Sequence, residues 1–154
     1  MNAHGQPDGH PADRPAPLRA VPGVLRIVHP ARAGELALIR AAVSGWGRQA
    51  QLPADVLVDL LLAVGEAAAN AVDHAYAGTD PGPVEVDLRV RAGTGGDRVV
   101  AARITDSGHW RPRAAPAHDR DRGRGLPMIR ALATRLDITP TGHGTEVCLE
   151  IPVP

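Results

Sequence analysis

Residues 66–76 read EAAANAVDHAY and end a helix that the sequence predicts from Pro53 to about Tyr76. Proline suits the first residue of a helix, and the glycine- and proline-rich stretch at 78–83 stops this one. At about 100° per residue, the apolar side chains share one face. They are Leu57, Leu60, Leu61, Val64, Ala68, Ala71, Val72 and Ala75. The polar side chains fall on the other face: Glu66, Asn70 and Asp73, with His74 at its edge.

The polar face of this helix is either an ordinary solvated surface or one wall of a cleft. It is poor in long charged residues, because Leu62, Ala63, Ala67 and Ala69 also lie on it. Glu66, Asn70 and His74 are each one turn apart, so their side chains converge. An asparagine carbonyl is an oxygen ligand that suits Mg²⁺, and a carboxylate one turn earlier can accept a proton. The helix is therefore a candidate wall of a catalytic cleft.

The elements around this helix alternate in a regular order. A strand at 24–28 and a helix at 32–50 precede it, and a strand–turn–strand hairpin at 84–105 follows. After a long polar loop at 107–122, a third helix begins near Gly125, and two strands at 135–139 and 145–151 end the chain. The apolar stripes of the first and third helices consist of Leu36, Ile39, Val43 and Trp46, and of Leu126, Ile129, Leu132 and Leu136. This order predicts an α+β two-layer sandwich, with three main helices on one face of a mixed, mostly antiparallel sheet.

A glycine element ends the second hairpin strand, where the sequence reads Thr105-Asp106-Ser107-Gly108. Asp106 either caps a turn or accepts a hydrogen bond from an amine in a pocket. In the second case Gly108 would let a flat ligand approach the backbone.

Two more glycine elements follow the long loop. Gly123-Arg124-Gly125-Leu126 opens the third helix, where free backbone N–H groups favour phosphate. Arg122 lies beside it, although the acidic residues at 119 and 121 leave a plain solvated loop as the alternative. Thr145 follows Gly144 at the start of the last strand and, taken singly, is a packed strand residue.

Composition excludes several classes of function. The 154 residues suit one domain at 23–154 behind a proline-rich tail at 1–22, for which we expect flexibility. Seventeen basic and seventeen acidic residues give no net field toward nucleic acid or an anionic membrane. All the basic residues are arginine, so a P-loop lysine, a Schiff-base lysine and a lysine base are excluded. The single cysteine, Cys148, excludes an internal disulfide and a cysteine zinc cluster. With no membrane span and no signal peptide in the sequence, we expect the cytoplasm by elimination.

In order and spacing, these motifs resemble those of the histidine-kinase-like ATPase superfamily (GHKL, Bergerat fold) over about residues 24–152. Residues 66–76 look like its N box, 106–108 and 123–126 like its two glycine boxes, and 144–145 like its last motif. Within the superfamily, the N box is similar to that of the small anti-sigma factor serine kinases. The resemblance implies a protein that binds ATP and Mg²⁺ and transfers phosphate to a serine.

The resemblance also implies roles for individual residues. Asn70 would hold Mg²⁺, Glu66 would be the general base, and Asp106 would read the adenine amine, directly and through a water shared with Thr145. The lid and phosphate contacts would come from Gly108, Gly123 and Gly125. The remaining residues implied at the nucleotide are Asp73, His74, Arg122, Arg124 and Leu126.

The partners implied are a sigma factor, gripped through Arg40, and an anti-anti-sigma protein of the STAS type. A homodimer is also implied, for which the strand at 24–28 offers an edge. His109-Trp110 stands where the first glycine box usually continues to a second glycine, which leaves nucleotide affinity and lid closure open.

Three other functions are alternatives to a protein serine kinase. A non-catalytic module that responds to ATP or ADP and holds a regulator is the main one, because a glutamate at position 66 can also be structural. A metal hydrolase would use His74, His109, His118 and Asp119, which lack ligand spacing. A transmitter histidine kinase is disfavoured, since no dimerisation helix with a phosphorylatable histidine precedes the domain.

Overall fold

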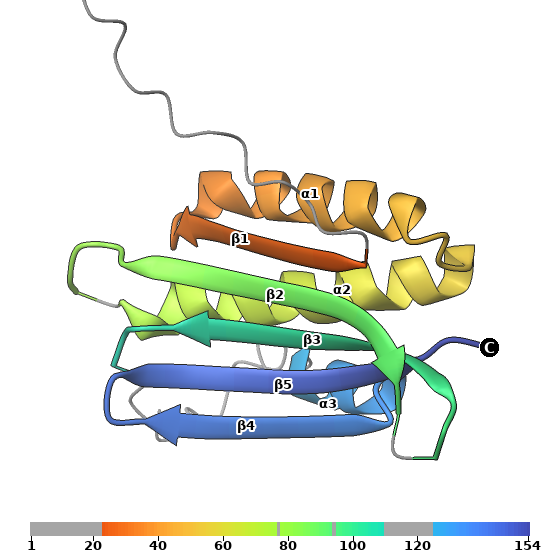
Figure 1. Cartoon of the computed structure of the whole chain (residues 1–154). Helices are drawn as coiled ribbons and strands as arrows, with labels where there is room; N and C mark the ends of the chain where they lie inside the picture. The colour runs from red at the N-terminus through yellow and green to blue at the C-terminus, as the bar shows by residue number, and fades with distance from the viewer. Residues whose placement is uncertain (1–22, 77, 94, 110–124) are drawn as a thin grey trace, which may run out of the picture.

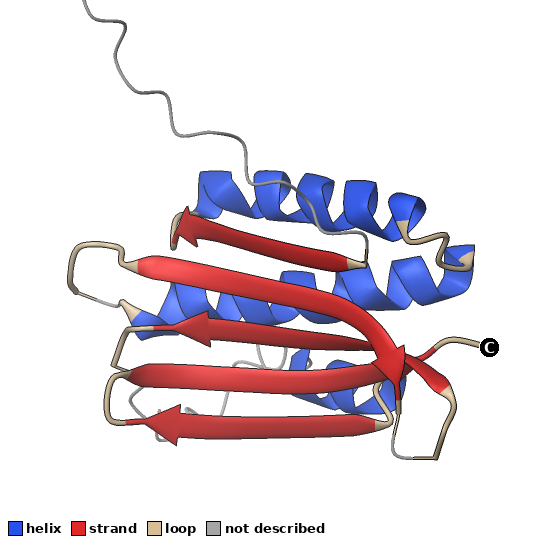
Figure 2. Cartoon of the chain, in the orientation of Figure 1, coloured by secondary structure: helices blue, strands red, loops and turns tan. Residues whose placement is uncertain are grey.

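A computed structural model describes residues 23–76, 78–93, 95–109 and 125–154. The sheet lies in front of the helices in Figure 1, and Figure 2 separates the two layers by colour. The elements are β1 (Val24–Pro30), a 3₁₀ turn (Ala33–Glu35), α1 (Leu36–Gln49), α2 (Ala54–Asn70), η2 (Ala71–Ala75), β2 (Pro83–Ala92), β3 (Arg98–Asp106), α3 (Gly125–Leu132), β4 (Arg135–Thr141) and β5 (Gly144–Pro152). The predicted α+β two-layer sandwich and its element order are confirmed.

The five strands lie in the order β1-β2-β3-β5-β4, and every neighbouring pair is antiparallel. We expected a mixed, mostly antiparallel sheet, and the described strands pair in the antiparallel direction alone. The chain crosses behind the sheet through α3 after β3, then returns through β4 at the edge to β5 beside β3. Asp106 at the end of β3 is thereby paired with Thr145 at the start of β5.

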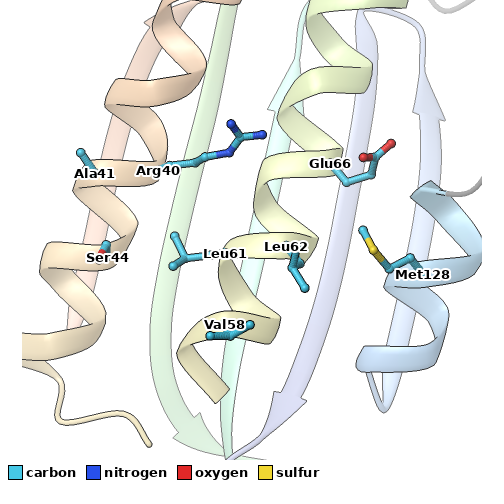
Figure 3. Close-up of a pocket in the computed structure, with 8 residues that line it drawn as sticks. All are labelled: Arg40, Ala41, Ser44, Val58, Leu61, Leu62, Glu66 and Met128. Atoms are coloured by element: carbon cyan, nitrogen blue, oxygen red, sulfur yellow. The ribbon is translucent and has the colours of Figure 1, made fainter. Parts of the chain in front are cut away.

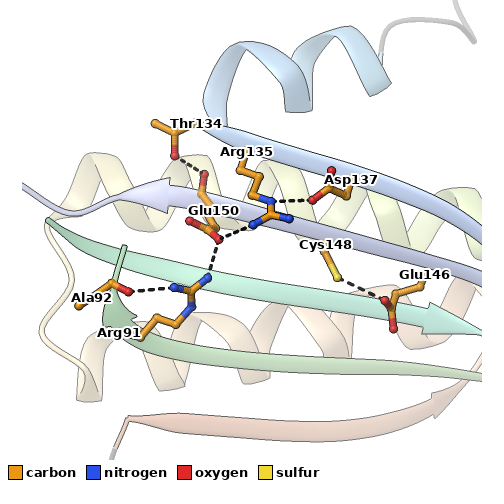
Figure 4. A network of polar contacts seen from close by, with 8 residues as sticks. All are labelled: Arg91, Ala92, Thr134, Arg135, Asp137, Glu146, Cys148 and Glu150. Carbon is orange, nitrogen blue, oxygen red and sulfur yellow. Dashed lines mark hydrogen bonds and ion pairs between the residues drawn. The ribbon is translucent and has the colours of Figure 1, made fainter. Parts of the chain in front are cut away.

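The hairpin of β2 and β3 follows the alternation in its sequence. Val84, Val86 and Leu88 point toward the helices and are at most 1% exposed. Side chains between them point to the open face, where arginines and acids pair: Arg26 with Glu85 and Asp87, Arg103 with Asp87 and Glu146, Arg91 with Glu150, and Arg135 with Asp137 and Glu150. Figure 4 shows the part of this network around Glu150. The open face is therefore charged, and the apolar core formed by the described residues lies between the sheet and the helices.

Helix α2 is buried over a wider arc than its sequence predicts. Ala63 and Ala67, which we assigned to the polar face, are 0% and 4% exposed. The assignment was wrong because α2 packs against α1 on one side and α3 on the other, as well as against the sheet. Leu62, by contrast, is 45% exposed on the outer side. Pro53 is the N-cap of α2 rather than its first helical residue.

The third helix is shorter than its apolar stripe suggested. It ends at Leu132, and Leu136 belongs to β4. Ile129 is fully buried, whereas Leu126 is 37% exposed. The tail at 1–22 and most of the loop at 107–122 lie outside the described residues. Among the helices in the described ranges, none combines the length and the hydropathy needed to span a membrane.

Candidate functional site

Asp106 and Thr145 form one corner of the site, where the ends of β3 and β5 meet. Asp106 Oδ1 accepts hydrogen bonds from the backbone N–H of Gly108 at 3.0 Å and of Thr145 at 3.3 Å. Burial raises the pKa of the Asp106 carboxyl above its ordinary value, while those two N–H groups act in the opposite direction. The second oxygen, Oδ2, makes no hydrogen bond to a described residue. This corner therefore presents a partly desolvated acceptor.

The Thr145 hydroxyl is an unsatisfied buried group. Thr145 is 8% exposed, and its Oγ1 has no hydrogen-bond partner among the described residues. Such a group costs about 1–3 kcal/mol if it remains unpaired. A packed strand residue, the simpler interpretation of Thr145, accounts for the burial but not for the unused hydroxyl. An acceptor on Asp106 beside an unused hydroxyl on Thr145 fits an amine-bearing ring or a bridging water.

The glycines of this corner are required by the protein's own packing. A Cβ on Gly108 would overlap the backbone carbonyl of Ala75, at the end of η2. A Cβ on Gly144 would overlap the backbone carbonyl of Asp106, and Gly144 has a φ of +145°. Gly108 was expected to admit a flat ligand, but the side on which its Cβ would lie faces the helix end. The Asp106 loop is thus pressed closely against both η2 and β5.

The helix that bears the N box changes pitch after Asn70. Residues Ala71–Ala75 form a π-helical turn, η2, which widens the spacing of side chains around the axis. Glu66 and Asn70 keep the one-turn spacing of an α-helix, and both are half-buried. His74 lies four residues after Asn70 within η2 and is half-buried, and its convergence with Asn70 stays a prediction. Asp73 is exposed on the same turn.

Tyr76 connects this helix end to the Asp106 loop. Its hydroxyl donates to the Pro83 carbonyl at 2.8 Å and accepts from the Ser107 N–H at 2.8 Å. Burial raises the pKa of the Tyr76 phenol, and the Asp106 carboxylate adds to the rise, while the Ser107 N–H opposes it. Sequence reasoning assigned Tyr76 no role. Gly82 leaves room for the phenol, since a Cβ there would lie 2.7 Å from the phenol oxygen.

Glu66 forms the other corner, between α2 and α3. A Cβ on Gly125 would overlap the Glu66 carboxylate, so any side chain at the first residue of α3 would require Glu66 to move. Glu66 also lines a groove of about 500 Å³ across the helical layer. Figure 3 shows its eight lining residues: Arg40, Ala41, Ser44, Val58, Leu61, Leu62, Glu66 and Met128. The groove is mainly apolar, and Asp106 is not among its lining residues.

Arg40 extends from α1 across α2. Its Nε lies 3.1 Å from the position that a Cβ on Gly65 would take, so Gly65 leaves room for the guanidinium. Figure 3 shows the guanidinium directed from α1 toward α2, along the groove that Glu66 also lines. Arg122, Gly123 and Arg124, which we assigned to the nucleotide site, lie outside the described residues.

A metal site would have few protein ligands. Within the described ranges, no three His, Cys, Asp or Glu side chains are grouped closely enough to hold a metal ion, and His118 and Asp119 lie outside them. Mg²⁺ commonly takes only one or two protein oxygens and completes its shell with phosphates and waters. The half-buried amide of Asn70, one turn from Glu66, fits such a ligand.

Comparison with models of known protein families identifies the family of this chain. The model of the histidine kinase-like ATPase domain matches residues 29–151. This chain belongs to that family. Membership as a histidine kinase-like ATPase domain confirms the resemblance drawn from the four motifs, and it implies that the chain binds ATP.

Solved structures agree with this family. The structure of the RsbU and RsbW domains of Rv1364c from Mycobacterium tuberculosis is similar with a TM-score of 0.63 and 25% identity, over 85% of this chain and 33% of that one. The chain thus spans one third of that structure. Two structures of the blue-light activated histidine kinase from Erythrobacter litoralis EL346 share the fold. The structure of the histidine kinase domain has a TM-score of 0.50 at 22% identity, and the match covers 80% of this chain and 61% of that one. The other structure has a TM-score of 0.52 at 23% identity, and the match covers 80% of this chain and 42% of that one.

Replacing Asp106 with asparagine is expected to weaken the binding of ATP and of ADP equally, by about 1–2 kcal/mol, because the hydrogen-bond acceptor loses its charge. The same change should stabilise the unliganded protein at neutral pH. Since folding raises this pKa, ionised Asp106 lowers stability at pH 7, and wild type gains stability as pH falls through the folded pKa. Calorimetric titration and urea unfolding at several pH values measure both effects.

Asp80 is the matched control, because its carboxylate is exposed. Asp80→Asn should change neither nucleotide affinity nor the pH dependence of stability. If Asp106→Ala keeps the wild-type preference for adenine over guanine nucleotides, Asp106 does not read the base.

Proposed function

We propose that this histidine kinase-like ATPase is a protein serine kinase that phosphorylates an anti-anti-sigma protein of the STAS type and also sequesters a sigma factor. The observation that carries the proposal is the position of Glu66, a half-buried carboxylate one helical turn before the Asn70 amide on α2. Similarity to the mycobacterial structure that contains an RsbW domain supports the same choice at 25% identity. Such partner switching would take place in the cytoplasm, with Arg40 on the surface offered to the sigma factor.

The chain's own residues divide the work of this reaction. Asp106 and Thr145 would hold the adenine, and Asn70 would bind a magnesium ion that neutralises phosphate charge. Glu66 would accept the hydroxyl proton of the substrate serine. The serine oxygen would then bond to the γ-phosphorus, while the bond between that phosphorus and the ADP oxygen breaks. Arg122, Gly123, Arg124 and Gly125 would supply the cations and N–H groups for the phosphates.

A second candidate is a non-catalytic module that binds ATP or ADP and holds a regulator. The contact between Glu66 and Gly125 favours it, because a glutamate packed against a helix start can serve structure alone. The two functions share the nucleotide site and differ only in whether phosphate is transferred.

Incubation with γ-labelled ATP and STAS-type proteins from the same genome tests the proposal. We expect label on a serine of one of these proteins, and mass spectrometry identifies the residue. If the chain binds ATP but labels none of them, the binding module replaces the kinase.

We also expect a homodimer that pairs through β1. In the described sheet β1 pairs only with β2, and Val28 on this edge is 56% exposed. An arginine there should weaken the dimer, since charge on an edge strand opposes pairing. Thr139→Arg is the control, because Thr139 is exposed on β4, at the opposite edge of the sheet. Light scattering that shows a strict monomer of wild type at high micromolar concentration would contradict this expectation.

A further inference from the structure

Three contacts hold the end of η2 against the loop that bears Asp106. The Ala75 carbonyl accepts the His109 N–H at 2.8 Å, and Gly108 packs against the Ala75 backbone. The third contact is the Tyr76 hydroxyl, which accepts the Ser107 N–H. Because the same hydroxyl donates to Pro83 at the start of β2, it is fixed from two sides.

Ser107 lies between Asp106 and Gly108, the residue whose N–H orients the Asp106 carboxylate. A shift of Ser107 would therefore move that N–H and turn the carboxylate away from Thr145. The same helix carries Asn70, six residues before Tyr76. Tyr76 thus sets the position of Asp106 relative to Asn70, and these are the residues assigned to opposite ends of the nucleotide.

We propose that Tyr76 is a positioning residue for adenine recognition, acting through the bond of its hydroxyl to Ser107. This inference rests on the nucleotide site in the proposed function. A purely structural tyrosine would need its ring, which packs against Gly82, more than its hydroxyl. The hydroxyl bonds are exposed, so water can replace them at small cost in stability, but water cannot fix the direction of the loop.

Tyr76→Phe keeps the ring and removes the hydroxyl. We expect ATP and ADP affinity to fall by the same factor, about 2- to 10-fold, and the preference for adenine over guanine nucleotides to narrow. Thr134→Val is the matched control, because it also removes a hydroxyl bonded to a backbone carbonyl, that of Glu150 near the other end of β5. It should cost comparable stability in urea and leave nucleotide affinity unchanged.

Two further measurements keep the inference testable if Tyr76→Phe folds poorly. Gly82→Ala retains the phenol but places a methyl group against it, so it should lower the affinity for ADP as Tyr76→Phe does. Tyr76 is the sole tyrosine in the chain, so 3-fluorotyrosine labelling gives one ¹⁹F signal. ADP should shift that signal, with a midpoint at the calorimetric Kd, and inorganic tripolyphosphate should not.

The outcomes separate this inference from the function on which it rests. If wild type does not bind ADP, the nucleotide site is wrong. If wild type binds ADP but Tyr76→Phe and Gly82→Ala bind it with unchanged affinity and base preference, the site stands and Tyr76 is only structural.

Discussion

Glu66→Gln is expected to lower the rate of phosphate transfer to the antagonist by about 10²–10⁴-fold, the usual contribution of a general base. Glutamine preserves the shape of the side chain and its contact with Gly125, but it cannot accept the serine proton. ATP affinity and sequestration of the sigma factor should remain near wild type. Single-turnover transfer from labelled ATP, with calorimetry alongside, separates the two quantities.

Asp59→Asn is the control for this experiment, since Asp59 is a half-buried carboxylate on α2 outside the site. It should transfer phosphate at the wild-type rate. If Glu66→Gln unfolds the domain or abolishes nucleotide binding, the contact with Gly125 is the main role of Glu66 and the mechanism loses its base.

Asn70→Ala should remove the part of ATP affinity that depends on Mg²⁺. The amide is the neutral oxygen that we assign to the metal, and even the loss of an outer-shell partner costs about 10–100-fold in metal affinity. Titration with ATP in Mg²⁺ should therefore show at least that loss. In EDTA, wild type and variant should bind ATP with similar affinity. Equal affinity in Mg²⁺ would show that Asn70 is not the metal ligand.

The fold could be predicted from the sequence because its signals are local. Strict alternation at 84–91 defined β2, and spacings of three and four defined α1 and the core side of α2. The burial of Ala63 and Ala67 could not be predicted, because it depends on α1 and α3 packing on both sides of α2. The π-helical turn after Asn70 was also not predicted, because it has no simple sequence signal.

Site residues that belong to a recognisable sequence motif could be predicted. Asp106 and Thr145 were assigned together through the family resemblance, and β3 and β5 place them side by side. Contacts between distant segments were missed. Gly125 was assigned to the lid and phosphate contacts, whereas in the fold it also makes room for Glu66. The role of Tyr76 depends on Ser107, 31 residues further along, and only the folded chain reveals it.

A crystal structure of the protein with Mg²⁺ and a non-hydrolysable ATP analogue tests the nucleotide site most directly. We expect the adenine amine on Asp106, an ordered water or ring nitrogen on the Thr145 hydroxyl, and the metal on the Asn70 amide oxygen. Glu66 should remain free of the metal and close to the terminal phosphate. An analogue bound elsewhere, or one that leaves Asp106 and Thr145 without contact, would contradict the assignment of this site.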